Sequence, residues 1–484
     1  MRDEGAKPTL SQCRRHSDKV IFGSLIFIVA IAPLPLGSAS PLSAAIVAIA
    51  TSATLICWAL SLGLGLTRLH VATSALKWPV FIYLAVCSWI FIQWAPWTPV
   101  LFADPIWQST SEVLTLPLHG SISVNPDATI TGLLNLFLYG GIFWLTFQMT
   151  QSSERAWTLI HAVTYIGSAY ATYGIVIYMT GNEWVAIYPK TSYLNSLTST
   201  FVNRNSYATF AGLTLLSAAV LLLNYMKPYF ALRHPIRVKL VIITEELVEK
   251  SALKTSAALS IAISLLLTAS RAGTFSSAIG LITLIIIFIR QQKLKTQHVA
   301  YAVATAVVLA SILIAVSGNY FSKRLKSGEV DSGIAFRGYM YSLTWEAIKS
   351  SPLKGTGFGT YADVIPAYKE DRVNAPVQRW DKAHNTYLEN AMELGLPAAA
   401  MLNISIALVA LITAGGMSRR RRDKLIPALG VCATVLVALH SFVDFSLQIP
   451  AVAILYACIM GVAASQSWSA TASNANQPEV APTP

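Results

Sequence analysis

The stretch from Gly273 to Ile289 reads GTFSSAIGLITLIIIFI and contains no charged residue. A helix of this length is close to what is needed to cross the hydrocarbon core of a bilayer. The whole chain is also strongly apolar: 54% of its 484 residues are hydrophobic and only 12% are charged. So large an apolar fraction excludes an ordinary soluble domain. The sequence therefore predicts an all-α polytopic membrane protein.

Hydropathy along the chain predicts about twelve transmembrane helices, of which the quoted stretch is the eighth. No small-residue cleavage pattern follows the first apolar run, so we expect that run to remain in the mature protein. The predicted spans cover residues 20–38, 42–66, 78–97, 130–149, 157–179, 206–226, 255–271, 273–289, 299–317, 394–415, 425–444 and 450–466.

Lysine and arginine gather on one side of these spans. They follow the second, fourth, sixth, eighth and tenth spans, whereas none occurs from Trp78 to Glu154. Short cytoplasmic loops accumulate basic residues, so the pattern predicts that both termini are cytoplasmic. The formal charge of +12 then reflects topology and contacts with anionic lipid rather than nucleic-acid binding.

This topology divides the chain into five parts. The longest loop lies on the outer side, carries both signs of charge and many aromatic residues, and is predicted to be largely helical. The expected parts are an N-terminal cytoplasmic tail (1–19), nine transmembrane helices (20–317), the outer loop domain (318–393), three further helices (394–466) and a disordered cytoplasmic tail (467–484).

Three arginines lie at the outer ends of spans or in the outer loop. Arg204 precedes the sixth span, Arg271 lies in the turn between the seventh and eighth, and Arg337 lies early in the long loop. A guanidinium keeps its proton and offers two parallel donors to a phosphate, which suits a pyrophosphate at a dry interface. The alternative for each is an interfacial side chain or a salt bridge to a loop carboxylate.

His384 lies in AHNTYLENAM (383–392), next to Asn385 and close to Tyr387 and Glu389. An imidazole beside a carboxylate is a natural general base near neutral pH. The alternative is a structural histidine that caps the helix leading into the tenth span, although Asn385 could do the same. We favour a catalytic or acceptor-binding role for His384.

Two other features of the outer side have structural interpretations. His440 and Asp444 are four residues apart, and we favour a buried hydrogen-bonded pair over a supporting role at the site. The segment 351–360 resembles a phosphate loop but lacks the lysine–hydroxyl ending, so we expect a glycine turn that allows close backbone approach. No HExxH motif, paired aspartates or Cys/His cluster indicates a bound metal, and no cofactor is expected.

Residues 200–450 resemble the O-antigen ligase and polymerase superfamily of bacterial membrane glycosyltransferases. His384 and Asn385 match a His-Asn pair that family ligases follow with a glycine, here Gly395. Many members have a second glycine three residues later, where this chain has Ala398. The motifs that carry the resemblance are FVNRNSYA (201–208), SRAG (270–273), the loop from Arg337 through Trp345 and Pro352 to GTGFG (355–359), HNTYLENAMELG (384–395) and HSFVDFSLQIP (440–450).

The resemblance implies a GT-C-like enzyme of the bacterial inner membrane with a periplasmic active site. Its donor would be a glycan on undecaprenyl pyrophosphate, and its acceptor a sugar hydroxyl of lipid A-core. Transfer would invert the anomeric carbon without a metal ion. His384 would be the base and Arg204, Arg271 and Arg337 would bind the pyrophosphate. The supporting residues would be Asn203, Asn385, Tyr387, Glu389 and Asp444.

Other functions share parts of this pattern. A repeat-unit polymerase, or a ligase that attaches glycan to a protein such as a pilin, uses the same donor chemistry. Twelve spans and a large loop between the ninth and tenth favour the lipid A-core ligase. A transporter or flippase would carry ionisable residues near the middle of its spans, and these are almost absent here.

Overall fold

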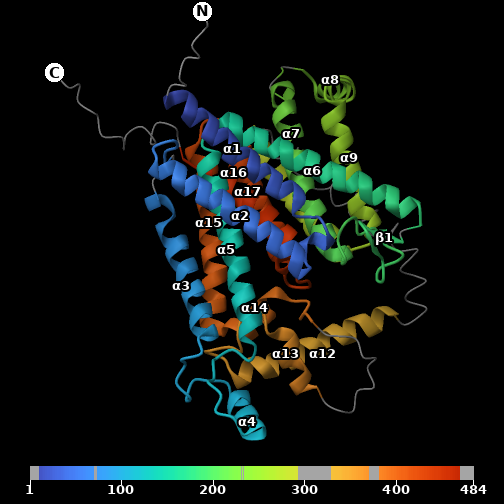
Figure 1. The fold of residues 1–484 in the computed structure, drawn as a ribbon. Coiled ribbons are helices and arrows are strands. Elements are labelled where there is room, and N and C mark those ends of the chain that lie inside the picture. Colours follow the sequence, from blue (N-terminus) through green and yellow to red (C-terminus); the bar gives the residue numbers. More distant parts are fainter. Residues whose placement is uncertain are drawn as a thin grey trace, which may run out of the picture.

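The computed structural model describes residues 10–69, 73–181, 183–230, 232, 234–292, 329–369 and 381–468. Within these ranges the chain forms a bundle of α-helices, accompanied by one short hairpin of β1 (Trp184–Val185) and β2 (Tyr188–Pro189) (Figure 1). The long helices are α1 (Leu10–Ile31), α2 (Pro41–Gly63), α3 (Lys77–Trp94), α5 (Pro126–Met149), α6 (Ser153–Met179), α7 (Arg204–Phe230), α9 (Ala252–Leu267), α10 (Arg271–Gln291), α15 (Leu396–Arg419), α16 (Leu425–His440) and α17 (Pro450–Ser465).

Further helices, most of them short, connect these. Those of the predicted outer loop, α12 to α14, lie together at one end of the bundle (Figure 1). The connecting elements are α4 (Pro105–Leu114), α8 (Ile236–Glu249), α12 (Glu329–Ser350), α13 (Tyr361–Val364) and α14 (Thr386–Leu394), with 3-10 turns η1 (Leu36–Ser38), η2 (Thr73–Leu76), η3 (Ile365–Tyr368) and η4 (Ser446–Gln448).

Seven helices in the described ranges are long and apolar enough to cross a membrane, and an eighth results if the bent pair α8 and α9 is one span. The predicted eighth span falls in α10, whereas α16 and α17 are apolar but only 16 residues long. The predicted span 299–317 lies outside the described residues. The all-α polytopic fold is confirmed, and the count of twelve stays a prediction.

The bundle is organised around α17. Of its residues Pro450–Ser465, all except Ala457 are buried, as expected for a helix that is apolar on every face. It packs against α5 and α16. Gly461 allows the close approach to α5, because a Cβ there would lie 2.7 Å from the carbonyl oxygen of Phe143. By contrast, α3 exposes large apolar side chains such as Trp78 and Phe81, which suits contact with lipid.

Several predicted cytoplasmic segments meet at one end of the bundle. Arg155, at the start of α6, forms an ion pair of 3.4 Å with Asp18 of α1. In the link between α15 and α16, the Arg420 guanidinium donates to the carbonyl oxygen of Trp468, 3.0 Å away and just after α17. The structure thus places the first half of α1 and the segment after α17 beside two basic links. This agrees with the expected topology, whose orientation in a membrane stays a prediction.

Candidate functional site

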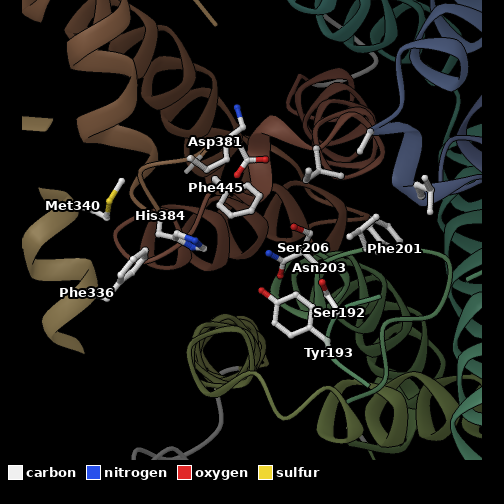
Figure 2. Close-up of a pocket in the computed structure, with 15 residues that line it drawn as sticks. Ser192, Tyr193, Phe201, Asn203, Ser206, Phe336, Met340, Asp381, His384 and Phe445 are labelled. Carbon is white, nitrogen blue, oxygen red and sulfur yellow. The ribbon is translucent and has the colours of Figure 1, made fainter. Parts of the chain in front are cut away.

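Five helix ends meet at the opposite end of α16 and α17. Here α7, α10 and α14 begin, α16 ends at His440 and α17 begins at Pro450. Beside them lies a cavity of about 370 Å³ that combines an apolar wall with polar side chains (Figure 2). Its lining residues are Leu36, Ala39, Ser192, Tyr193, Phe201, Val202, Asn203, Ser206, Phe336, Met340, Asp381, Lys382, His384, Phe445 and Ile449.

His384 lines this cavity, as expected for a catalytic residue. It lies immediately before α14 with a left-handed backbone (φ 53°) and its side chain is 26% exposed. The Tyr341 hydroxyl donates to its carbonyl oxygen over 3.0 Å, and the Phe445 ring packs edge-on at 4.9 Å between centroids. Nδ1 of His384 lies 3.8 Å from Oδ1 of Asp444. The imidazole therefore borders the cavity with a carboxylate nearby, at a distance too long for a hydrogen bond.

Asp444 is fully buried and belongs to a hydrogen-bonded group. Nδ2 of Asn205 donates to its Oδ1 over 3.2 Å, and the Ser446 hydroxyl donates to its Oδ2. Burial acts to raise the pKa of Asp444, but interaction with His384, the nearby His440 and the Ser446 hydrogen bond together hold that pKa below its usual value. Asp444 is therefore ionised at neutral pH and can stabilise a positive charge on His384.

The expected pair of His440 and Asp444 is not formed. The four-residue spacing assumed one continuous helix, but α16 ends at His440 and Asp444 lies beyond it. Nδ1 of His440 instead lies 2.6 Å from the Thr209 hydroxyl of α7, and Ser446 stands between the histidine and Asp444. Interpreting Asp444 as part of a structural pair with His440 was wrong, because the turn after α16 directs its carboxylate toward His384.

Asn385 is the N-cap of α14. Its Oδ1 accepts hydrogen bonds from the backbone N–H groups of Tyr387 and Leu388, at 3.0 and 3.1 Å. The capping role therefore falls to Asn385 and not to His384. The Tyr387 hydroxyl donates to the Ala438 carbonyl oxygen over 3.0 Å, which attaches α14 to α16. Both residues support the site by fixing the helix that follows His384.

Glu389 fixes the segment that precedes His384. It is buried, its Oε2 accepts the Ala383 N–H over 2.8 Å, and its Oε1 pairs with Lys382 at 3.2 Å. One turn later, Glu393 accepts the Tyr361 N–H over 3.0 Å. Burial, reinforced by the charge of Glu389, raises the pKa of Glu393. Glu389 and Lys382 thus hold the chain on one side of His384, and Asn385 holds it on the other.

The three arginines lie around the cavity but not in its lining. Arg204 donates to the Ser196 hydroxyl over 3.1 Å, and its guanidinium lies 5.4 Å from the centre of the Tyr193 ring. Arg271 is exposed at the first position of α10. Arg337 is partly buried on α12, directly after the lining residue Phe336. The structure therefore gathers the three residues at one end of the bundle without joining their side chains in one cluster.

Asn205, which sequence analysis missed as a site residue, connects two of these arginine segments to Asp444. While its Nδ2 donates to Asp444, its Oδ1 accepts from the hydroxyl of Ser270, 2.8 Å away, the residue before Arg271. The predicted Asn203 lines the cavity, and its Oδ1 accepts the Asn205 N–H over 2.7 Å. Asn205 follows Arg204 in the motif FVNRNSYA, so its position was a usable signal.

Glycine turns fix the far end of α14, as predicted. Gly355, Gly357 and Gly359 all have positive φ, between 69° and 106°. A Cβ on Gly355 would lie 2.3 Å from the carbonyl oxygen of Glu393, so this segment serves close backbone packing. Within the described ranges, no group of three or more His, Cys, Asp or Glu side chains could hold a metal ion.

The fold and this end of the bundle define a polytopic helical membrane protein with a His–Asp pair at a cavity and three arginines at the same end of the bundle. Residues 256–403 match the family model described as O-antigen ligase, and the match contains Arg271, Arg337 and His384. This match supports the resemblance in the motifs, and residues 256–403 are similar to the O-antigen ligase family. Such proteins are glycosyltransferase-like ligases and polymerases, which supports an enzymatic role. The search of curated proteins finds no match for this sequence.

Proposed function

We propose that this protein is an O-antigen ligase of the bacterial inner membrane. It transfers a glycan from undecaprenyl pyrophosphate to a sugar hydroxyl of lipid A-core, with inversion and without a metal ion. The reaction takes place in the cavity beside His384, on the periplasmic side, while both termini are cytoplasmic. The family match supports the class of reaction, and the arrangement of the described residues supports the assignment of roles.

One observation carries the proposal: His384 borders the cavity while the Asp444 carboxylate lies 3.8 Å from its Nδ1. A proton on Nδ1, directed toward Asp444, leaves Nε2 able to accept the proton of an attacking hydroxyl. The sugar hydroxyl is weakly acidic, so removal of its proton as the new bond forms lowers the barrier. General-base assistance of this kind contributes typically about 10² to 10⁴-fold.

The leaving group requires positive charge. Breaking the bond between the anomeric carbon and the pyrophosphate oxygen places negative charge on the pyrophosphate. Arg204, Arg271 and Arg337 would stabilise this charge, as fixed cations do when they are held in place before the reaction. Asn205 is hydrogen-bonded to Asn203 and Ser270, the residues before Arg204 and Arg271, which supports fixed positions for these two arginines.

The identity of the acceptor is tested by gel electrophoresis of lipopolysaccharide from a deletion strain, and from the same strain complemented with wild-type protein or with His384→Ala. Bare lipid A-core in the deletion strain and in the His384→Ala strain, with polymer retained on undecaprenyl pyrophosphate, is the result we expect. Lipid A-core capped by a single repeat unit would instead identify a polymerase. An unchanged gel in the deletion strain would contradict the lipid A-core acceptor and favour a protein acceptor or a transporter.

A further inference from the structure

Tyr193 has an unusual backbone conformation in the loop that leads from the β-hairpin to α7. Its φ is +56°, in the left-handed region, where a bulky aromatic residue is a genuine outlier. The turn is closed by the Ser196 N–H, which donates to the Tyr193 carbonyl oxygen over 3.0 Å. It is also closed by the buried ammonium of Lys190, which donates to the Ser196 carbonyl oxygen over 2.7 Å. Strain of this kind persists only where surrounding contacts impose it, and it clusters at ligand sites.

The side chain of Tyr193 is directed into the cavity. It lies on the wall opposite His384, with its hydroxyl pointing toward the space between them (Figure 2). One face of its ring lies 5.4 Å from the Arg204 guanidinium. None of the described residues hydrogen-bonds the hydroxyl. The strained turn thus presents one polar atom to whatever occupies the cavity.

Charges of both signs surround this hydroxyl, and the Arg204 guanidinium at one face of the ring favours an anionic ligand on that side. Burial raises the pKa of Tyr193, Arg204 and Arg337 oppose that rise, and Asp444 and Asp381 act in the same direction as burial. The net effect is a raised pKa, so the phenol keeps its proton at neutral pH and is a hydrogen-bond donor. A hydroxyl that donates beside the Arg204 guanidinium is an arrangement that binds phosphate oxygens.

The position of Tyr193 relative to His384 matches the geometry of an inverting displacement. In such a reaction the attacking hydroxyl and the leaving group occupy opposite faces of the sugar ring, so base and leaving-group contacts lie on opposite sides of the site. His384 and Tyr193 occupy opposite walls of one cavity (Figure 2).

We propose that Tyr193 is a further catalytic residue, whose hydroxyl donates a hydrogen bond to a phosphate oxygen of the leaving pyrophosphate. No covalent step is assigned to Tyr193, since the bond that breaks is the one between the anomeric carbon and the phosphate oxygen. This inference rests on the proposed function, because it assumes that the cavity holds a pyrophosphate-linked donor.

The test is Tyr193→Phe, which removes only the hydroxyl. The matched control is Tyr188→Phe, since Tyr188 lies in the neighbouring hairpin and is exposed. Purified full-length protein is assayed for donor turnover and for inhibition by inorganic pyrophosphate. A hydrogen bond to a charged group supports an expected loss of roughly 10- to 100-fold in kcat/KM and a comparable weakening of pyrophosphate inhibition. The control should stay within about twofold of wild type on the same scale.

Two outcomes would overturn the inference. If Tyr193→Phe retains both turnover and pyrophosphate inhibition, the hydroxyl does not contact the substrate. If turnover falls but inhibition by pyrophosphate is unchanged, the contact is to sugar and the phosphate assignment is wrong. Protection of each variant from thermal unfolding by pyrophosphate gives the same information without turnover. Failure of the proposed function is distinguishable, because His384→Ala would then retain transfer whatever the result for Tyr193.

Discussion

Replacing Asp444 by asparagine should disable the base while leaving the cavity nearly the same size. The carboxylate lies 3.8 Å from Nδ1 of His384 and is fully buried. At this separation, an effective dielectric constant of about 20 gives an attraction of roughly 4 kcal/mol between a carboxylate and an imidazolium. The imidazolium forms only as the acceptor proton is removed, so the loss should fall on kcat. A loss of this size corresponds to a reduction of about a thousandfold.

The assay is steady-state donor turnover by purified Asp444→Asn at saturating donor, with thermal unfolding to confirm the fold. Asp363→Asn is the matched control, because Asp363 is exposed in α13 and accepts a hydrogen bond from Asn125 over 2.9 Å. We expect the control to retain nearly full turnover. A folded Asp444→Asn variant with kcat within about threefold of wild type would refute the electrostatic role, since a buried unit charge at this distance has a far larger effect.

Two further predictions concern stability. Burial lowers the pKa of Lys190 from 10.5 to about 8, so above that pH the unfolded chain binds more protons than the folded one and stability should rise toward pH 10. Thermal midpoints of wild type and Lys190→Met between pH 7.5 and 9.5 check this, and parallel profiles would contradict it. Gly355→Ala should destabilise the fold by about 1–3 kcal/mol, because its φ is +69° and the new Cβ would meet Glu393. Gly338→Ala, in open space on α12, should be neutral or stabilising by up to about 1 kcal/mol. Denaturant titration of both glycine variants checks this, and equal changes in the free energy of unfolding would contradict the steric argument.

Local chemistry made part of this molecule predictable. The uncharged run at 273–289 lies inside α10, since a span that long and apolar has few alternatives. Asn385 caps α14 because a short acceptor side chain before a helix satisfies its first free N–H groups. The glycines after Ser351 adopt positive φ, which their lack of a side chain permits. His384 borders the cavity as the polar motif around it indicated.

Contacts between distant segments could not be predicted in the same way. Asn205 and Asp444 meet across 239 residues of sequence, and no local pattern encodes that pairing. The position of Asp444 depends on where α16 ends, and helix boundaries are set by competition with the turn that follows. The left-handed backbone of Tyr193 could not be predicted from the local sequence, because hydrogen bonds of Lys190 and Ser196 in the folded loop impose it. Lys382 was missed because its partner Glu389 was interpreted only as a neighbour of His384.

The central claim is that His384 is the base of a glycosyl transfer. It is tested most directly by donor consumption in purified full-length protein, comparing His384→Ala with wild type and with His119→Ala. His119 is an exposed histidine between α4 and α5. The account predicts that donor turnover falls by about 10² to 10⁴-fold for His384→Ala, and that His119→Ala remains near wild type. Near wild-type turnover by well-folded His384→Ala protein would contradict the account.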